Sequence, residues 1–171
     1  MIVVVAGVAG SGKTTVGRQL AARLGWAFAD GDTFHPAANV AKMRAGLPLA
    51  DADRQPWLAA MTSWMDDVLA SGQSAVLACS ALKRSYRDEL LDGRPQAVLV
   101  FLDITQSVCH ARLVGRTGHF FLEPLMASQF QALEPPDPAE TRVHDLPVGD
   151  DESPGQVVTE IITELSLQSA K

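Results

Sequence analysis

The chain has 171 residues, 47% of them hydrophobic and 20% charged, which is the composition of an ordinary globular protein. Its formal net charge of −6 argues against a general nucleic-acid-binding surface or an anionic-membrane surface. We expect a single domain over residues 1–171, without an apolar run long enough to span a membrane. Ten of the fourteen basic residues are arginine, a side chain that suits bidentate recognition of phosphates and carboxylates.

The two cysteines, Cys79 and Cys109, do not have the spacing of metal ligands. The first expected strand begins at residue 2 without a basic leader, so no secretory signal is expected. Free thiols fit a reducing compartment, and we therefore expect a cytoplasmic protein.

The first fourteen residues carry the strongest motif of the chain. Residues 2–6 are an apolar, valine-rich run that predicts a buried strand, and residues 15–24 predict a helix. Between them, residues 7–14 read GVAGSGKT and fit the pattern G-x-x-x-x-G-K-[ST]. In this context glycines let several N–H groups point inward, and the helix N-terminus adds partial positive charge. The alternative is a glycine-rich turn without a ligand.

We expect the loop and the start of its helix to bind the phosphates of ATP. The predicted nucleotide-binding residues are Gly7, Val8, Ala9, Gly10, Ser11, Gly12, Lys13, Thr14 and Thr15. Lys13 is expected to reach the β- and γ-phosphates and to act in catalysis, and the Thr14 hydroxyl is expected to hold Mg²⁺.

The rest of the chain alternates between predicted strands and helices. Further strands are expected at residues 26–29, 75–79, 97–102 and 143–148. Further helices are expected at residues 36–45, from 54 or 56 to 71, from about 83 to 91, 105–116, 125–133 and 154–167. Residues 47–53 are expected to form a polar loop. This order predicts an α/β fold, with a five-stranded parallel sheet between two helical layers and ligands at the carboxyl ends of the strands.

Residues 30–58 read DGDTFHPAANVAKMRAGLPLADADRQPWL, and this segment closely resembles the gluconokinase family of small P-loop sugar-acid kinases. That family is related to shikimate kinases and nucleoside-monophosphate kinases. The resemblance continues at residues 79–83, 86–88, 112–113, 116–121 and 129–134. It implies a nucleoside-monophosphate-kinase-like P-loop fold, a substrate-binding segment over 31–58, a short lid over 112–126 and a homodimer.

An acceptor with one carboxylate and several hydroxyls needs an arginine and a mixture of hydrogen-bond donors and acceptors. The candidate acceptor-binding residues are Asp32, His35, Asn39, Lys42, Arg54, Ser80, Lys83, Arg87 and His119. Whether Arg54 or Arg87 binds the carboxylate stays open.

Asp32 is the candidate base or hydroxyl-orienting group, because a carboxylate at the end of the second strand can accept the proton of the attacking hydroxyl. The alternative is a turn-forming aspartate, the role that we expect for Asp30. His35 precedes a proline and has the alternative of stabilising a helix start. Lys42 and Lys83 have the alternative of being solvated surface charges.

Arg112 and Arg116 are four residues apart, so both can project from one helical face. The resemblance implies that they act in catalysis as part of the lid, which closes over the transferring phosphoryl group and excludes water. The alternative interpretation of Arg112 and Arg116 is a pair of exposed surface arginines. His119 is expected to pack or hydrogen-bond within the lid. Asp103 follows the fourth strand and is not expected to bind magnesium, which leaves the second magnesium ligand open. Residues 134–152 are expected to form a solvated acidic surface.

The resemblance therefore implies ATP-dependent phosphorylation of gluconate at its 6-hydroxyl. The net charge and the absence of a long apolar run favour a protein without a nucleic-acid or membrane partner. Two alternatives stay open. One is a kinase for another sugar acid, shikimate or a nucleotide. The other is a regulatory P-loop protein that binds ATP without turnover.

Overall fold

The structure, a computed structural model, describes residues 1–114 and 123–169. Its strands are β1 (Ile2–Ala6), β2 (Ala27–Asp30), β3 (Ala75–Cys79), β4 (Ala97–Asp103) and β5 (Val143–Pro147). Its helices are α1 (Lys13–Leu24), the short 3₁₀ helix η1 (Gly31–Phe34), α2 (Ala37–Arg44), α3 (Asp51–Ala70), α4 (Arg84–Leu91), α5 (Gln106–Val114), α6 (Glu123–Ala132) and α7 (Pro154–Glu164).

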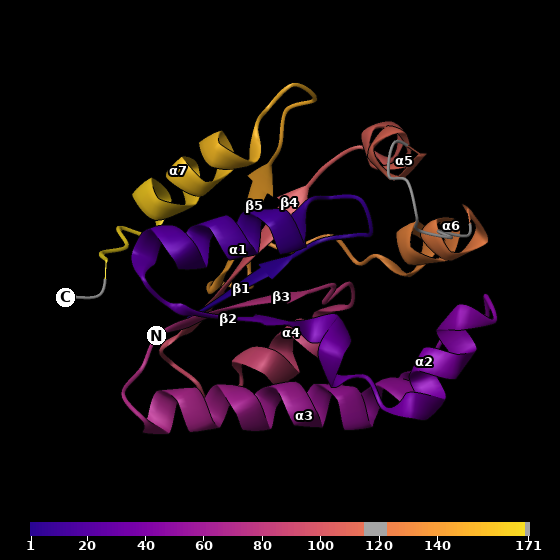
Figure 1. The fold of residues 1–171 in the computed structure, drawn as a ribbon, viewed down its shortest axis with the longest axis horizontal. Helices are drawn as coiled ribbons and strands as arrows, with labels where there is room; N and C mark the ends of the chain where they lie inside the picture. The colour runs from indigo at the N-terminus through magenta and orange to yellow at the C-terminus, as the bar shows by residue number, and fades with distance from the viewer. Residues whose placement is uncertain (115–122, 170–171) are drawn as a thin grey trace.

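The strands form one parallel sheet in the order β2-β3-β1-β4-β5. Helices α1 and α7 cover one face of this sheet, and α3 and α4 cover the other (Figure 1). The predicted three-layer α/β/α fold with a five-stranded parallel sheet is therefore confirmed. Because all five strands are parallel, their carboxyl ends lie along one edge of the sheet, where ligands bind in this class of fold.

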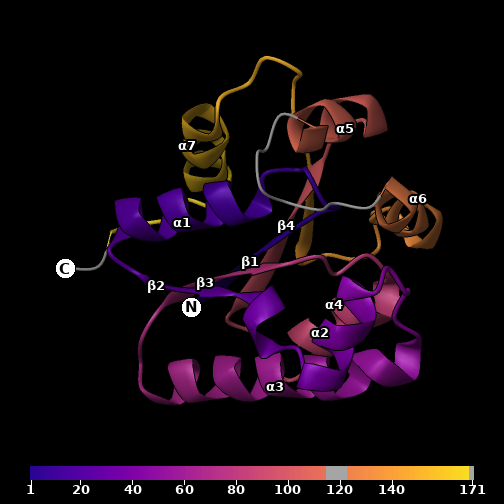
Figure 2. The ribbon, with the colours of Figure 1, turned by 45° about the vertical axis from the view of Figure 1, so that its right-hand side comes forward.

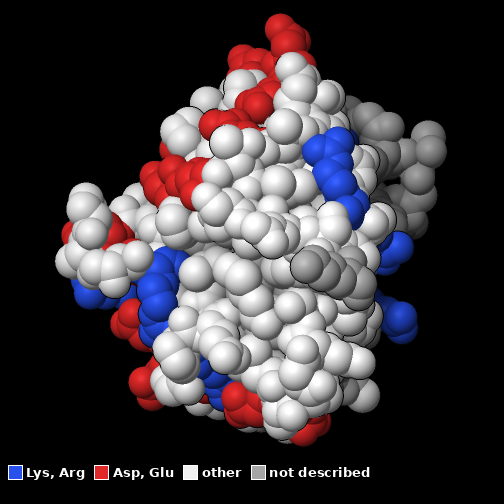
Figure 3. Space-filling view, turned by 90° about the vertical axis from the view of Figure 1, so that its left-hand side faces the viewer, with Lys and Arg blue, Asp and Glu red and all other residues white. Residues whose placement is uncertain are grey.

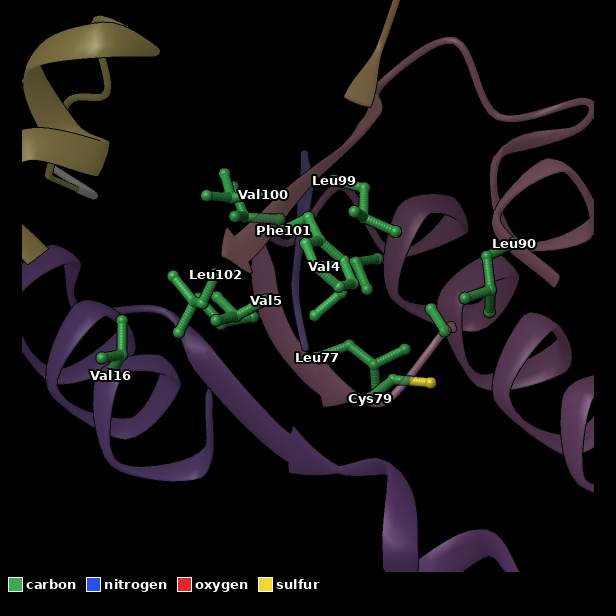
Figure 4. Close-up of a cluster of buried hydrophobic side chains, with 14 of the residues drawn as sticks. Val4, Val5, Val16, Leu77, Cys79, Leu90, Leu99, Val100, Phe101 and Leu102 are labelled. Atoms are coloured by element: carbon green, nitrogen blue, oxygen red, sulfur yellow. The ribbon is translucent and has the colours of Figure 1, made fainter. Parts of the chain in front are cut away.

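The centre of the sheet is apolar on both faces because helices cover it on both sides. Every residue of β1 has no exposed surface. Val4 and Val5 lie among Leu77, Leu99 and Leu102 of the neighbouring strands (Figure 4). One face of α3 is also buried, at Trp57, Leu58, Met61, Met65 and Val68.

Helix α3 begins three residues before the earliest predicted start. The Asp53 carboxylate accepts a hydrogen bond from the Ala50 N–H at 2.9 Å and so caps the first turn. Asp51 and Asp53 also place negative charge at the positive end of the helix dipole. Pro56 was the sequence signal for a later start, but it lies inside the helix. The predicted polar loop at 47–53 therefore ends at residue 50.

Helices α2, α5 and α6 gather at the end of the sheet that carries the loop after β1 (Figures 1 and 2). The side of the molecule seen in Figure 3 has its charged side chains in small separate groups of both signs. Among the described residues, no helix combines the length and the apolar character that crossing a bilayer requires.

Candidate active site

Three glycines shape the loop between β1 and α1. Their φ angles are 145° at Gly7, 85° at Gly10 and 93° at Gly12, a region that side-chain-bearing residues rarely adopt. A Cβ atom on Gly10 would also lie only 2.7 Å from the carbonyl oxygen of Cys109 in α5. Gly12 caps α1 without a side-chain hydrogen bond, so the N–H groups of the first turn remain available to an anion. The loop has the geometry of a phosphate cradle.

Lys13 is the first residue of α1, and its ammonium nitrogen lies 3.5 Å from the Val8 carbonyl oxygen. The side chain therefore bends back over the loop. Ser11 lies within the loop and is 1% exposed, and its hydroxyl oxygen has no hydrogen-bond partner among the described residues. The structure thus keeps the predicted nucleotide-binding residues 7–15 together in one loop and one helical turn.

A cavity of about 180 Å³ lies beside this loop. Its walls come from the loop and the start of α1, the segment after β2, α2 and its connection to α3, the start of α3, the turn after β3, and α6. The structure brings five of the predicted catalytic and acceptor-binding residues to it, namely Lys13, Asp32, His35, Arg54 and Ser80.

Asp32 reaches the cavity because η1 turns the chain sharply after β2. The Asp30 carboxylate accepts a hydrogen bond from the Asp32 N–H at 3.1 Å, and the Asp30 carbonyl accepts one from the Thr33 hydroxyl at 2.7 Å. Asp30 is therefore the turn-forming aspartate, as predicted. The Asp32 side chain lines the cavity together with Lys13, which brings a carboxylate and the phosphate-binding ammonium into one space.

His35 is held in a fixed orientation at the cavity wall. Its ring stacks on Trp57 with centroids 4.7 Å apart, and the Trp57 indole N–H donates to the Gly31 carbonyl at 2.7 Å. Burial lowers the pKa of His35, with Arg54 acting in the same direction and Asp32 against it. These contacts fix the plane of the imidazole at the cavity wall.

Asn39 determines which nitrogen of His35 carries the proton. The Asn39 amide nitrogen donates to the Asp53 carbonyl oxygen at 2.7 Å, which fixes the orientation of the amide. The same nitrogen lies 3.4 Å from His35 Nδ1, so Nδ1 is the acceptor. The neutral imidazole therefore carries its proton on Nε2.

Arg54 is the arginine that lines the cavity. One guanidinium nitrogen donates to the Leu49 carbonyl oxygen at 2.6 Å, and the guanidinium carbon lies 5.8 Å from the centre of the Tyr86 ring. The same nitrogen lies 3.8 Å from an Asp51 carboxylate oxygen, and the Arg54 side chain is 24% exposed. A guanidinium has five N–H donors, so donors remain for an acceptor carboxylate.

The expectation that Arg87 binds the acceptor is wrong. Its side chain has no exposed surface, and its Nε and Nη2 donate to the Glu140 carboxylate at 2.7 and 2.8 Å. The remaining Nη1 donates to the carbonyl oxygens of Leu82 and Glu134 at 3.1 and 2.9 Å. Arg87 holds the turn after β3 against the end of α6. The predicted solvated surface at 134–152 is wrong at Glu140, which is buried as the partner of Arg87.

Three further candidates do not line the cavity. Asn39 is 4% exposed and supports His35. Lys42 contacts the Asp53 carboxylate at 2.6 Å, and Lys83 contacts the Asp51 carboxylate at 2.8 Å. These contacts lower the pKa of both aspartates. The three residues brace the start of α3, which carries Arg54.

Arg112 lies at the phosphate loop, where its guanidinium donates to the Ser11 carbonyl oxygen at 3.3 Å. A Cβ atom on Gly12 would lie 3.8 Å from the same guanidinium nitrogen. This position fits a charge that acts on loop-bound phosphates. Most of the predicted lid, residues 115–122, lies outside the described residues. This part includes Arg116 and His119.

Gln129 is a polar cavity residue to which sequence reasoning assigned no role. It lies in α6, and its side-chain oxygen accepts a hydrogen bond from the Ala9 N–H at 2.7 Å. Residues 129–134 were part of the family resemblance, but the apolar periodicity of this helix does not single out a glutamine.

The family described as shikimate kinase matches this chain over residues 9–166. The match covers most of the chain, including nearly all of the loop and every wall of the cavity. The chain belongs to the shikimate kinase family. It is a kinase, and its loop is that of a P-loop kinase.

Within this family the chain is similar to gluconokinases. It is 45% identical to a gluconokinase of Gluconobacter oxydans over 159 residues, which cover 93% of this chain and 88% of that protein. The crystal structure of a gluconokinase from Sinorhizobium meliloti superposes with a TM-score of 0.83 at 42% identity, covering 96% of this chain and 90% of that one. An unliganded sugar kinase from a Janibacter species superposes with a TM-score of 0.88 at 40% identity, covering 96% and 94%. The predicted resemblance to the gluconokinase family is confirmed.

Proposed function

We propose that this kinase transfers the γ-phosphoryl group of ATP to the 6-hydroxyl of D-gluconate and releases 6-phosphogluconate and ADP. The observation that carries the proposal is the single cavity that contains both Lys13 of the phosphate loop and Asp32, with His35 and Arg54 in its wall. The gluconokinases of Gluconobacter oxydans and Sinorhizobium meliloti support gluconate as the acceptor.

The cavity suits a small, hydroxyl-rich acid. Its volume of about 180 Å³ is below the roughly 300–1,000 Å³ of pockets for drug-sized ligands, which favours a six-carbon acid over a nucleotide acceptor. Arg54 offers a guanidinium to the carboxylate. The His35 Nε2–H donor and the Ser80 hydroxyl offer hydrogen bonds to the hydroxyl groups of the acceptor.

Phosphoryl transfer depends on positioning and on charge neutralisation. The N–H groups of the loop and the Lys13 ammonium hold the phosphate oxygens of ATP and stabilise their charge. Asp32 accepts a hydrogen bond from the 6-hydroxyl and takes its proton as the new O–P bond forms. Arg112 adds positive charge at the loop.

Magnesium would be held by the Thr14 hydroxyl in the first turn of α1. Among the described residues, no group of three or more His, Cys, Asp or Glu side chains could hold a metal ion. A single hydroxyl ligand from the protein fits a magnesium ion that keeps water and substrate phosphate oxygens as most of its ligands. When bound, the ion would supply positive charge that offsets the negative charge of the phosphates.

The proposal includes a homodimer, which the family resemblance implies, and a cytoplasmic location, which the free thiols favour. Cys79 and Cys109 are buried free thiols, and burial raises the pKa of Cys79 to about 12 and that of Cys109 to about 11. Neutral buried thiols suit a reducing compartment. Sedimentation equilibrium tests the dimer directly.

An ADP-release assay with separate acceptors tests the reaction. We expect MgATP turnover with D-gluconate and a product phosphorylated at carbon 6, identified by ³¹P and ¹³C NMR. Turnover with shikimate or a nucleoside monophosphate, but not with gluconate, would show that the proposed acceptor is wrong. Tight ATP binding without turnover for any acceptor would indicate a regulatory protein.

A further inference from the structure

Gln129 joins the α6 wall of the cavity to the phosphate loop. Its Oε1 accepts a hydrogen bond from the Ala9 N–H at 2.7 Å, although the two residues are 120 positions apart in the sequence. Both residues line the cavity, and α6 lies at the loop end of the sheet in both ribbon views (Figures 1 and 2). The contact therefore lies between the nucleotide side and the acceptor side.

The partner of Gln129 is a main-chain N–H group of the loop that is expected to bind phosphate. A phosphate loop works by presenting main-chain N–H groups to phosphate oxygens. One such group, the Ala9 N–H, is occupied here by a neutral carbonyl oxygen. A charged phosphoryl oxygen is a stronger hydrogen-bond acceptor than a neutral amide oxygen. A nucleotide that uses the Ala9 N–H must therefore displace Gln129.

The displaced carboxamide has chemistry that an acceptor can use. It carries one carbonyl oxygen and two N–H donors, and it lines the same cavity as Asp32, His35 and Arg54. Hydroxyl groups of a sugar acid both donate and accept hydrogen bonds, so they match a carboxamide. While the Gln129 oxygen accepts a hydrogen bond from the Ala9 N–H, it is not fully available to hydrogen-bond an acceptor.

We propose that Gln129 is a further acceptor-binding residue, which the nucleotide releases from the loop. Its oxygen holds the Ala9 N–H in the nucleotide-free enzyme. A phosphoryl oxygen of ATP takes over this N–H, and the freed carboxamide binds hydroxyl groups of the acceptor. The inference rests on the proposed phosphorylation of gluconate, and it makes the acceptor site complete only after the nucleotide has bound.

The test compares Gln129→Met with Gln131→Met by isothermal titration calorimetry with the ATP analogue AMP-PNP. Methionine is close to glutamine in length but lacks the amide. Gln129→Met is expected to bind AMP-PNP about two- to tenfold more tightly, because no internal hydrogen bond has to be broken. Its KM for gluconate is expected to rise about two- to tenfold, because a donor and an acceptor are lost. Gln131 is exposed on the same helix and serves as the matched control.

Two further measurements sharpen the test. In the wild-type enzyme, AMP-PNP is expected to increase the affinity for gluconate, and Gln129→Met is expected to abolish this coupling. Gln129→Glu keeps an acceptor for the Ala9 N–H but adds negative charge beside the phosphates, so it is expected to weaken AMP-PNP binding.

Weaker or unchanged AMP-PNP binding in Gln129→Met, or coupling equal to that of Gln131→Met, would overturn the role of Gln129. A wild-type enzyme that does not phosphorylate gluconate would overturn the proposed function instead, so the two failures are distinguishable.

Discussion

The two sides of the cavity are built from different parts of the polypeptide. On the nucleotide side, residues 7–14 present main-chain N–H groups, and three glycine φ angles set their direction. On the acceptor side, Asp32, His35 and Arg54 present side chains. Stacking and hydrogen bonds from other elements hold two of these side chains, as in the contacts of His35 with Trp57 and Asn39. A main-chain site excludes added Cβ atoms, whereas a side-chain site depends on the identity of its residues and their supports.

This difference predicts that the two sides can be damaged separately. Changes at Arg54 and His35, which do not contact the phosphate loop, are expected to alter gluconate binding and leave nucleotide binding unchanged. Changes in the loop are expected to do the reverse. Asp32 lies where both sides meet, so its substitution tests the chemistry itself.

Asp32→Asn is expected to have the largest effect. The amide cannot take the proton of the acceptor hydroxyl, so kcat is expected to fall about 10²–10⁴-fold. AMP-PNP affinity and thermal unfolding are expected to stay near wild type, because the Asp30 carboxylate and not Asp32 forms the turn. Steady-state kinetics measure the change, and turnover close to wild type would remove Asp32 from the mechanism.

Arg87→Met separates a structural arginine from a binding one. It leaves the buried Glu140 carboxylate without its partner, and the free energy of unfolding is expected to fall by about 3–5 kcal/mol. Urea unfolding measures this loss. In the folded fraction of Arg87→Met, the KM for gluconate is expected to change less than it does in Arg54→Met. The reverse order would restore Arg87 as a candidate for the carboxylate.

Gly10→Ala tests the nucleotide side alone, with Gly93→Ala as its control. Both glycines have positive φ, 85° and 67°, but an added Cβ at Gly93 meets nothing within 4 Å. Backbone strain alone costs roughly 1–2 kcal/mol. At Gly10 the close approach to Cys109 adds about 1–3 kcal/mol. AMP-PNP binding is expected to be lost only in Gly10→Ala, and equal binding in both variants would contradict the role of the loop geometry.

Arg54→Met tests the acceptor side alone. Loss of charged hydrogen bonds to a carboxylate, worth about 1.5–3 kcal/mol, is expected to raise the KM for gluconate roughly 10- to 150-fold. The affinity for AMP-PNP is expected to be unchanged. Arg44→Met, an exposed position at the end of α2, is the control. An unchanged KM in Arg54→Met would assign the carboxylate to another residue.

The smallest effect is expected from the titration of His35. Burial lowers its pKa in the folded protein from the ordinary value of 6.5, so the unfolded chain binds more protons below that pH. The stability of the wild-type protein is therefore expected to fall as the pH decreases below about 6.5, and this part of the slope is expected to be absent in His35→Gln. Urea unfolding between pH 5.5 and 7.5 measures both slopes, which would be equal if His35 did not contribute.

The same division explains what could be predicted from the sequence. The phosphate loop is local, and eight consecutive residues define both its backbone and its chemistry, so the assignment to residues 7–15 holds together in the structure. The alternation of apolar strands and amphipathic helices likewise predicted the sheet and its layers. The ends of several strands and helices moved, as in β2, which covers Ala27–Asp30, and in α3, where the Asp53 cap placed the start before Pro56. The short helix η1 was not predicted.

The acceptor wall could be predicted only in part, because it depends on contacts between distant segments. Arg54 and Arg87 are equivalent as sequence signals. Glu140, which lies 53 residues after Arg87, determines that Arg87 is buried and leaves Arg54 at the cavity. Gln129 has no local signal, because its importance comes from the Ala9 N–H at the other end of the chain.

The stacking of Trp57 on His35 gives the enzyme a built-in fluorescent probe. The indole lies in the cavity wall, in ring contact with a residue expected to bind the acceptor. Indole emission depends on the polarity around the ring, so displacement of water by a sugar acid changes its intensity and wavelength. Trp26 and Trp64, the other two tryptophans, do not line the cavity. Ligand titrations and stopped-flow measurements can therefore follow occupancy of the acceptor site without a dye or a coupling enzyme.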